Sequence, residues 1–194
     1  MSEEEAGVRA RLVAAGVDLV LREGQSAVSL REIARRAGVS HGAPRRYFPT
    51  HVDLLSAIAR EGFADLTARV ERTMHTAGPE PRTRLVALAR TYLDFAAAHR
   101  GMFELMFRHD LLASGRLRLR ETSLPLFTLL TDLVARTPRP SDTPAPLVAG
   151  ALWANLHGIA QLWAWGSLPL ATGVDDDHPV LRAALDAHLG PAQT

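Results

Sequence analysis

The sequence predicts an all-α protein with an N-terminal three-helix domain and a C-terminal helical bundle. Apolar residues recur at helical spacing between capping residues and glycines. No segment alternates apolar and polar residues, with the turns needed, for long enough to form a sheet. Charge is uneven: residues 22–60 carry seven Arg and three acidic residues, whereas residues 143–174 contain no Asp, Glu, Lys or Arg. This asymmetry indicates two parts with different tasks.

The composition excludes several classes of protein. With 194 residues, 47% of them hydrophobic, and a net charge of +1, the chain can bury a sizeable core. The absence of cysteine rules out disulfides, thiolate metal sites and thiol nucleophiles. The acidic start, MSEEE, is unlike a secretory signal, so we expect a cytoplasmic protein.

The N-terminal domain is predicted over residues 6–66. A first helix should cover residues 5–22 and stop at Gly24. Ser29 and Glu32 have capping-box spacing and should begin a short helix that ends near residue 37. A second short helix is expected over residues 40–47, with Ser40 as its cap. A long helix should then run from Thr50 towards Met74.

Gly78 and the prolines after it mark the boundary of a C-terminal domain over residues 80–190. Four prolines between residues 137 and 146 indicate a loop. The helices expected in this domain cover residues 82–99, 102–107, 111–122, 124–137, 147–165 and 179–189.

Ile33-Ala34 followed by Gly38-Val39 has the spacing of a helix-turn-helix motif, at about residues 29–48. A small residue lets the second helix approach, and glycine permits the turn between them. Val39 and Phe48 should point into the core beside Ile33. The helix at residues 40–47 would then be presented to the major groove of DNA.

Outward-facing residues of that helix should contact base edges, and flanking residues should contact phosphates. The alternative is a plain helical hairpin whose arginines are simply solvated. The candidate DNA-binding residues are Ser29, Arg31, Ser40, His41, Gly42, Ala43, Arg45, Arg46, Tyr47 and His51.

The stretch SLREIARRAGVSHGAPRRYFPTHVDLLSAIA resembles the N-terminal DNA-binding domain of the TetR family of bacterial transcriptional regulators. WANLHG, at residues 153–158, resembles the Trp/His-Gly (WHG) type of C-terminal ligand-binding domain found in one branch of that family. The resemblance implies that residues 40–47 form the recognition helix and that Ser29 and His51 approach phosphates. It also implies a homodimer on a palindromic operator, usually a repressor released by a small molecule.

The sequence departs from the usual pattern of the family at three positions. Ala43, Arg45 and His51 stand where Thr, Tyr and Lys are frequent. DNA binding is still expected, but the operator sequence does not follow from the family pattern. His51 should carry more charge at acidic pH than at neutral pH.

The uncharged helix at residues 147–165 is apolar almost all the way round. We expect one face to be covered by its own domain and the other by a second copy of the chain. Together with the helix at residues 179–189 it would form a four-helix homodimer interface. A membrane span is the alternative, and Asn155, His157 and Gln161 oppose it.

Aromatic and methionine side chains predict a pocket for a small apolar or aromatic effector. Any one of these residues could instead be ordinary core, and His157 could be a core histidine bonded to a carbonyl. The candidate ligand-binding residues are Phe95, Met102, Phe103, Met106, Phe107, Leu129, Leu133, Trp153 and His157.

Enzymatic function is not expected, because the sequence has no phosphate-binding glycine loop, no nucleophile elbow and no HExxH zinc motif. We interpret residues 175–178 as a solvated capping loop rather than a metal site, and we expect no cofactor. The predicted function is a DNA-binding homodimeric repressor released by a small molecule. The alternatives are an activator, or a ligand-binding helical bundle without DNA binding.

Overall fold

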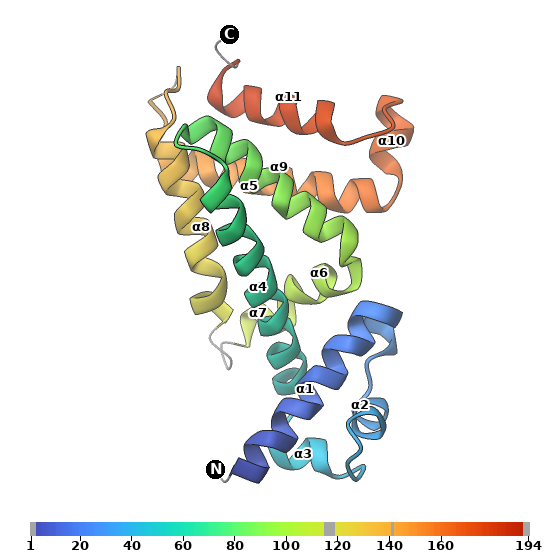
Figure 1. Ribbon diagram of the computed structural model, residues 1–194. Helices are drawn as coiled ribbons and strands as arrows, with labels where there is room; N and C mark the ends of the chain where they lie inside the picture. Colours follow the sequence, from blue (N-terminus) through green and yellow to red (C-terminus); the bar gives the residue numbers. More distant parts are fainter. Residues whose placement is uncertain (1–2, 115–118, 141, 192–194) are drawn as a thin grey trace. The chain divides into compact units, whose positions relative to one another are not determined.

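The computed structural model describes residues 3–114, 119–140 and 142–191, and the chain divides into two compact units. Unit 1 comprises Met1–Asp65 and His99–Ser123, and unit 2 comprises Leu66–Ala98 and Leu124–Thr194. Every regular element among the described residues is helical (Figure 1). The predicted all-α fold class is confirmed.

Unit 1 is built on one long helix, α1, which packs against the short helices that follow it and against α6 (Figure 1). The first part of α4 and the start of α8 also belong to this unit. Its elements are α1 (Glu3–Glu23), η1 (Gln25–Ala27), α2 (Leu30–Arg36), α3 (Ala43–Tyr47), α4 (His51–Thr76), α6 (Arg100–Met106), α7 (His109–Ala113) and α8 (Leu119–Arg136).

The core of unit 1 forms where α1, α2 and α4 approach one another. Leu12, Ile33 and Ile58 have no exposed surface. A β-carbon at Gly16 would overlap Cδ1 of Ile58, so glycine leaves the space that this isoleucine fills.

Helix α4 begins with a reciprocal cap. The amide of Asp53 donates to Oγ1 of Thr50 at 3.1 Å, and the amide of Thr50 donates to the Asp53 carboxylate at 2.9 Å. Two orphan amides are thereby satisfied, as the cap-like start at Thr50 predicts.

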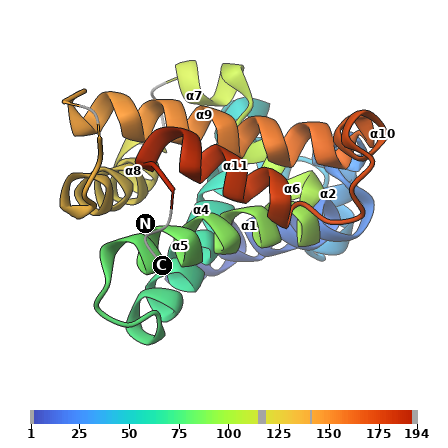
Figure 2. The same ribbon diagram turned by 90° about the horizontal axis from the view of Figure 1, so that it is seen from above.

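Unit 2 is organised around α9, which lies along α5 and α11 and contacts α10 (Figures 1 and 2). Its elements, besides the remainder of α4 and α8, are α5 (Pro81–Ala98), α9 (Ala145–Ala164), α10 (Ser167–Thr172) and α11 (His178–Leu189). Leu85, Ala149 and Leu152 are fully buried in its core. The Arg82 guanidinium contacts Asp186 at 2.5 Å and so joins α5 to α11.

Three details of the predicted helices are wrong. The expected break between residues 122 and 124 does not occur, because α8 is continuous from Leu119 to Arg136 with Pro125 inside it. The expected helix at residues 111–122 is replaced by α7 and the start of α8, and residues 115–118 lie outside the described residues. Helix α10, between two glycines at positive φ, was not expected.

Each helix in the part of the chain that the structure describes is too short or too polar to cross a membrane.

Candidate functional site

The turn after α2 is closed by backbone hydrogen bonds that require a glycine. Gly38 has φ +65°, a conformation that residues with a β-carbon rarely adopt. The amide of Val39 donates to the carbonyl of Ala34 at 3.1 Å, which is the long bond of a Schellman cap. Ile33 and Ala34 are fully buried beneath this turn. The predicted helix-turn-helix geometry therefore has a local cause in the sequence.

The N-terminus of α2 is capped by Ser29, whose Oγ accepts from the Glu32 amide at 3.2 Å. The expected return bond is replaced, because the Glu32 carboxylate accepts from Arg35 and Arg36 instead. Only one half of the predicted capping box forms.

Helix α3 is shorter than predicted and begins at Ala43 rather than at residue 40. The amide of Ala43 donates to the carbonyl of Ser40 at 3.0 Å in the turn before it, and Ser40 does not cap the helix. Pro44 explains the difference. Proline has no amide to donate to the carbonyl of Ser40, so a helix capped at residue 40 would lose its first bond. Pro44 is tolerated in the first turn of the shorter helix.

The predicted DNA-binding residues all lie in unit 1, and most are at its surface. Ala43 and Tyr47 are half-buried, Phe48 is buried as predicted, and Val39 is half-buried rather than in the core. The exposed residues of the set are Ser29, Arg31, Ser40, His41, Gly42, Arg45, Arg46 and His51.

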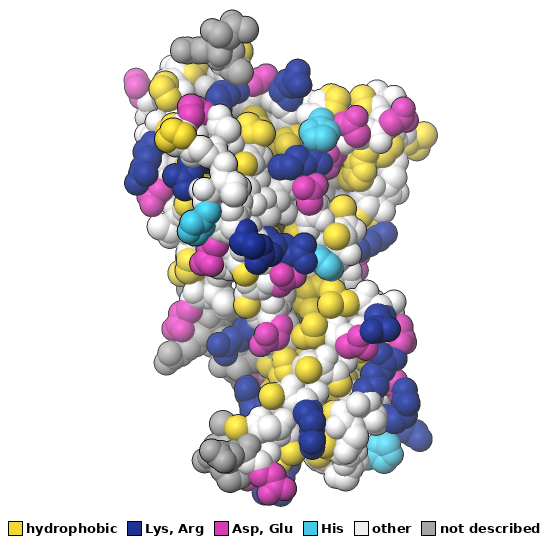
Figure 3. All heavy atoms as spheres, viewed as in Figure 1, with side chains coloured by type: hydrophobic (Ala, Val, Ile, Leu, Met, Phe, Trp, Pro, Cys, Tyr) yellow, Lys and Arg dark blue, Asp and Glu magenta, His cyan; other side chains and the backbone are white. Residues whose placement is uncertain are grey.

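The arginines near α2 and α3 fall into two groups. Arg36 is tied down by three carboxylates: Asp18 at 3.2 Å, Glu32 at 2.8 Å, and Glu23. Acidic side chains accordingly lie among the arginines over α2 in Figure 3. Arg45, in contrast, has no carboxylate partner among the described residues. Arg36 therefore fixes α2 on α1, whereas Arg45 is available to a ligand outside the unit.

The surroundings of Glu32 and His51 lower the pKa of both groups. Hydrogen bonds from Arg35 and then Arg36 lower the pKa of Glu32 to about 2, so this carboxylate stays ionised over the whole neutral range. Partial desolvation of the ring, together with the nearby charge of Arg108, lowers the pKa of His51. His51 is therefore neutral at pH 7 and needs a more acidic medium to become a cation.

Four of the nine candidate effector residues lie in unit 1. Met102, Phe103 and Met106 are buried on α6, and the Phe103 and Phe107 rings have centroids 5.0 Å apart. The Phe107 ring also meets Phe63 of α4 edge-on at 5.6 Å. These side chains pack α6 onto α4.

The other five candidates lie in unit 2, where two of them meet a buried tyrosine. Nε1 of Trp153 donates to the Tyr92 hydroxyl at 3.4 Å, and that hydroxyl lies 2.9 Å from Nδ1 of His157. Phe95 and Leu133 are buried, and Leu129 is half-buried. The structure thus joins α5 and α9 through hydrogen bonds among Tyr92, Trp153 and His157.

Burial shifts the pKa of two of these three side chains. Burial raises the pKa of Tyr92 and lowers the pKa of His157. Both groups are therefore neutral at pH 7, so the tyrosine hydroxyl can donate to His157 while it accepts from Trp153. Tyr92 was not among the candidate residues, although a tyrosine on the apolar face of a helix indicates a buried hydroxyl that needs a partner.

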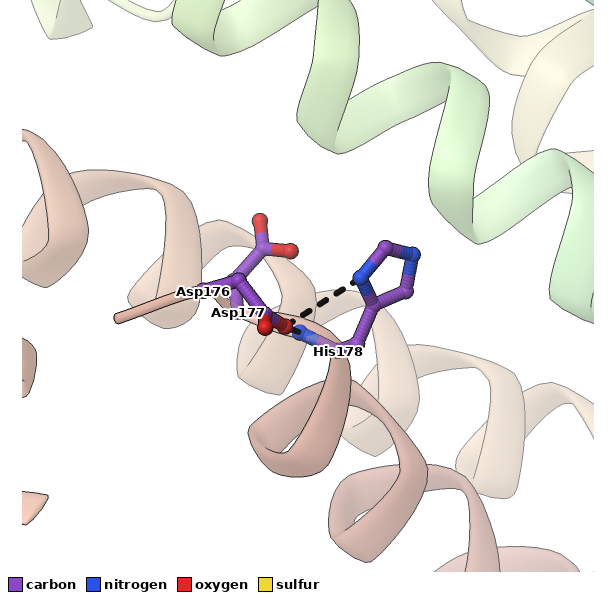
Figure 4. A group of neighbouring side chains, drawn as sticks. All are labelled: Asp176, Asp177 and His178. Carbon is purple, nitrogen blue, oxygen red and sulfur yellow. Dashed lines mark hydrogen bonds and ion pairs between the residues drawn. The ribbon is translucent and has the colours of Figure 1, made fainter. Parts of the chain in front are cut away.

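Asp176, Asp177 and His178 form a group of possible metal ligands at the start of α11 (Figure 4). The carboxylate of Asp176 accepts from the His178 amide at 2.9 Å and lies 3.2 Å from its Nδ1. Asp177 is paired with Arg90 at 2.7 Å. The Asp176 carboxylate therefore accepts from the first amide of α11, and the interpretation of residues 175–178 as a capping loop stays a prediction.

A helix-turn-helix in unit 1, together with a helical bundle in unit 2, is the organisation typical of a DNA-binding regulator with a second, helical domain. Residues 12–58 match the family described as "Bacterial regulatory proteins, tetR family", and residues 85–188 match "Tetracyclin repressor-like, C-terminal domain". The chain belongs to the TetR family of DNA-binding transcriptional regulators. The Trp/His-Gly type of the C-terminal domain stays a prediction.

Two curated relatives are regulators with opposite actions. The chain is 23% identical over 164 residues to the transcriptional activator FasR of Mycolicibacterium smegmatis, covering 84% of this chain and 74% of FasR. It is 39% identical over 85 residues to the transcriptional repressor KstR of Mycobacterium tuberculosis, covering 43% of this chain and only 38% of KstR.

Solved structures share the fold along almost the whole chain. A protein of unknown function from Rhodococcus sp. RHA1 is 33% identical, with a TM-score of 0.79 and 96% of both chains covered. The multidrug binding protein EbrR, solved with imidazole, is 28% identical, with a TM-score of 0.59 and 96% of both chains covered.

Proposed function

We propose that the protein is a homodimeric repressor that is released from a palindromic operator by a small apolar or aromatic effector. The observation that carries this proposal is the exposed Arg45 on α3, which has no carboxylate partner among the described residues and follows a glycine-closed turn. An arginine in that position can bind the O6 and N7 atoms of a guanine in the major groove.

The remaining contacts divide by chemistry. His41, Gly42 and Ala43 lie before or at the start of α3. The His41 ring can donate or accept a hydrogen bond, and the small Gly42 and Ala43 allow close approach to bases. Ser29 and Arg31 at the start of α2 and His51 at the start of α4 would contact phosphates, with His51 as a neutral hydrogen-bonding group at pH 7. Ser40, Arg46 and Tyr47 complete the proposed set.

The homodimer would form through α9 and α11. Leu147 and Trp165, at the two ends of α9, are 66% and 63% exposed, and a partner helix that covered them would remove this apolar surface from water. Between them, a β-carbon added at Gly150 or Gly158 would meet nothing within 4 Å among the described residues, so a partner helix could approach closely. Size measurement by light scattering tests this: a monomer at micromolar concentration contradicts it.

The effector site would be centred on Trp153 and His157, with Phe95, Leu129 and Leu133 of the same unit as its proposed apolar lining. The hydrogen bonds of Tyr92 with Trp153 and His157 could orient an aromatic ligand, while the apolar side chains bind its rings. Ligand binding would act through α6, whose Met102, Phe103, Met106 and Phe107 pack on α4. The effector must bind one state of the protein more tightly than the other for this to occur.

Selection of bound duplexes from a random pool, at fixed moderate salt, tests DNA recognition. An enriched palindrome supports the proposal and gives the half-site spacing. Affinity for that duplex should then fall steeply as salt rises, because contacts from arginine to phosphate release counterions. Absence of enrichment with a folded dimer favours a ligand-binding bundle without DNA binding.

Activation is the second candidate function, because the match to the activator FasR covers 84% of this chain. In vitro transcription from a promoter that carries the selected duplex separates the two. Repression predicts fewer transcripts when the protein is added, and activation predicts more.

A further inference from the structure

Arg46 of α3 is held by a carboxylate from the first turns of α1. Its Nη2 atom lies 3.1 Å from Oε1 of Glu5. Its guanidinium carbon also lies 5.9 Å from the centre of the Tyr47 ring. The Arg46 side chain is 71% exposed and that of Glu5 36% exposed, so the pair lies at the surface where α1 meets α3. DNA that reached α3 would meet this pair.

Glu5 is the last of three consecutive glutamates at residues 3–5. It contacts Arg46, which belongs to the segment 22–60 with seven Arg and three acidic residues. A DNA phosphate and the Glu5 carboxylate have the same charge and the same bidentate fit to a guanidinium. A phosphate that binds Arg46 must therefore displace Glu5 or share the arginine with it. In either case the carboxylate stays close enough to repel the phosphate.

We propose that Glu5 competes with DNA phosphate for Arg46 and so limits the affinity of the protein for DNA of any sequence. This inference rests on the proposed function, in which Arg46 contacts DNA. An exposed ion pair is weak, so the competition lowers the affinity without abolishing binding. Because the pair is at the surface, the competition should fade as salt screens it.

The test compares full-length wild type with Glu5→Gln on two duplexes, the one enriched from the random pool and a mixed-sequence duplex of equal length. Glu5→Gln should bind both about 2- to 5-fold more tightly at about 50 mM salt. The gain should shrink to less than about twofold at about 300 mM salt. An unchanged or weaker affinity at the lower salt overturns the proposal, since Glu5 would then be neutral or would position Arg46.

Two further variants separate the ion pair from simple net charge. Glu4→Gln removes the same charge from a neighbouring exposed residue that has no ion pair among the described residues, and it should change affinity by less than about twofold. In an Arg46→Gln background, Glu5→Gln should lose most of its effect. Equal gains from Glu4→Gln and Glu5→Gln contradict a specific competition. Failure of wild type to bind either duplex instead overturns the proposed function itself.

Discussion

Gly101 lies against the backbone of Val20, and a β-carbon at residue 101 would be 2.8 Å from the carbonyl oxygen of Val20. The same carbon would lie 2.9 Å from Cα of Gly24. Both are backbone atoms, which cannot rotate away as the end of a side chain could. A hydrogen bond of 3.2 Å between Gln25 and Glu104 adds a second link beside this contact. The docking of α6 on the end of α1 therefore depends on the absence of a side chain at residue 101.

Gly101→Ala should destabilise unit 1 by about 1–3 kcal/mol, because the added methyl group forces α6 away from α1. Urea unfolding measures this difference. Gly7→Ala is the matched control, since a β-carbon there would meet nothing within 4 Å among the described residues. That control should be neutral or stabilising by up to about 1 kcal/mol, as expected for an exposed helical glycine. Equal stability of Gly101→Ala and wild type would contradict the close contact.

The ion pairs of Glu32 predict a pH-dependent contribution to stability. Hydrogen bonds from Arg35 and Arg36 lower its pKa from 4.5 to about 2, so folding favours the ionised form. The contribution is fully present above the unfolded pKa and is lost as pH falls from about 4.5 towards 2. Glu32→Gln should therefore lower the melting temperature at pH 7, and its difference from wild type should shrink below pH 4.5.

Melting curves between about pH 2.5 and 7 test this prediction. Glu61→Gln, at an exposed position of α4 with no ion pair among the described residues, is the control and should leave the curve unchanged. A difference between Glu32→Gln and wild type that stays constant with pH would show that the ion pairs of Glu32 do not stabilise the fold.

Local signals explain how much of the fold could be predicted. Ser29 and Thr50 begin helices through hydrogen bonds that their side-chain oxygens accept, and Gly38 ends one through its backbone conformation. The positions of these helix ends could therefore be predicted from neighbouring residues. The effects of Pro125 and Pro44 could not, because the effect of a proline depends on where the helix begins.

Contacts distant in sequence explain what could not be predicted at the candidate sites. Glu5 and Arg46 are 41 residues apart, and Tyr92 and His157 are 65 apart, so no periodicity links them. The division of the chain into two units also depends on contacts between residues far apart in sequence. His99–Ser123 groups with the N-terminal residues, although it follows the predicted boundary near Gly78. The sequence shows a glycine at residue 101, but the reason for it is visible only in the structure, where Val20 lies beside it.

Tyr92→Phe should destabilise unit 2 by about 0.5–1.5 kcal/mol, because it removes the hydroxyl that contacts Trp153 and His157 without leaving a large cavity. Urea unfolding gives the difference. In the folded state, nitrogen chemical shifts should show a change at His157, whose Nδ1 loses the Tyr92 hydroxyl as a hydrogen-bond partner. Val86→Ala, at an exposed position of α5, should have little effect on either measurement.

Arg45→Ala should weaken binding to the selected duplex by about 1–3 kcal/mol, because it removes a bidentate contact to guanine. The base preference should relax at one position of each half-site and stay unchanged elsewhere, which repeated selection with the variant would reveal. Arg60→Ala, at an exposed arginine of α4 outside the proposed contact set, controls for the loss of one positive charge and should leave the preference intact. A uniform loss of affinity across all sequences with Arg45→Ala would place Arg45 on the phosphate backbone, and base recognition would then rest on His41 and its neighbours.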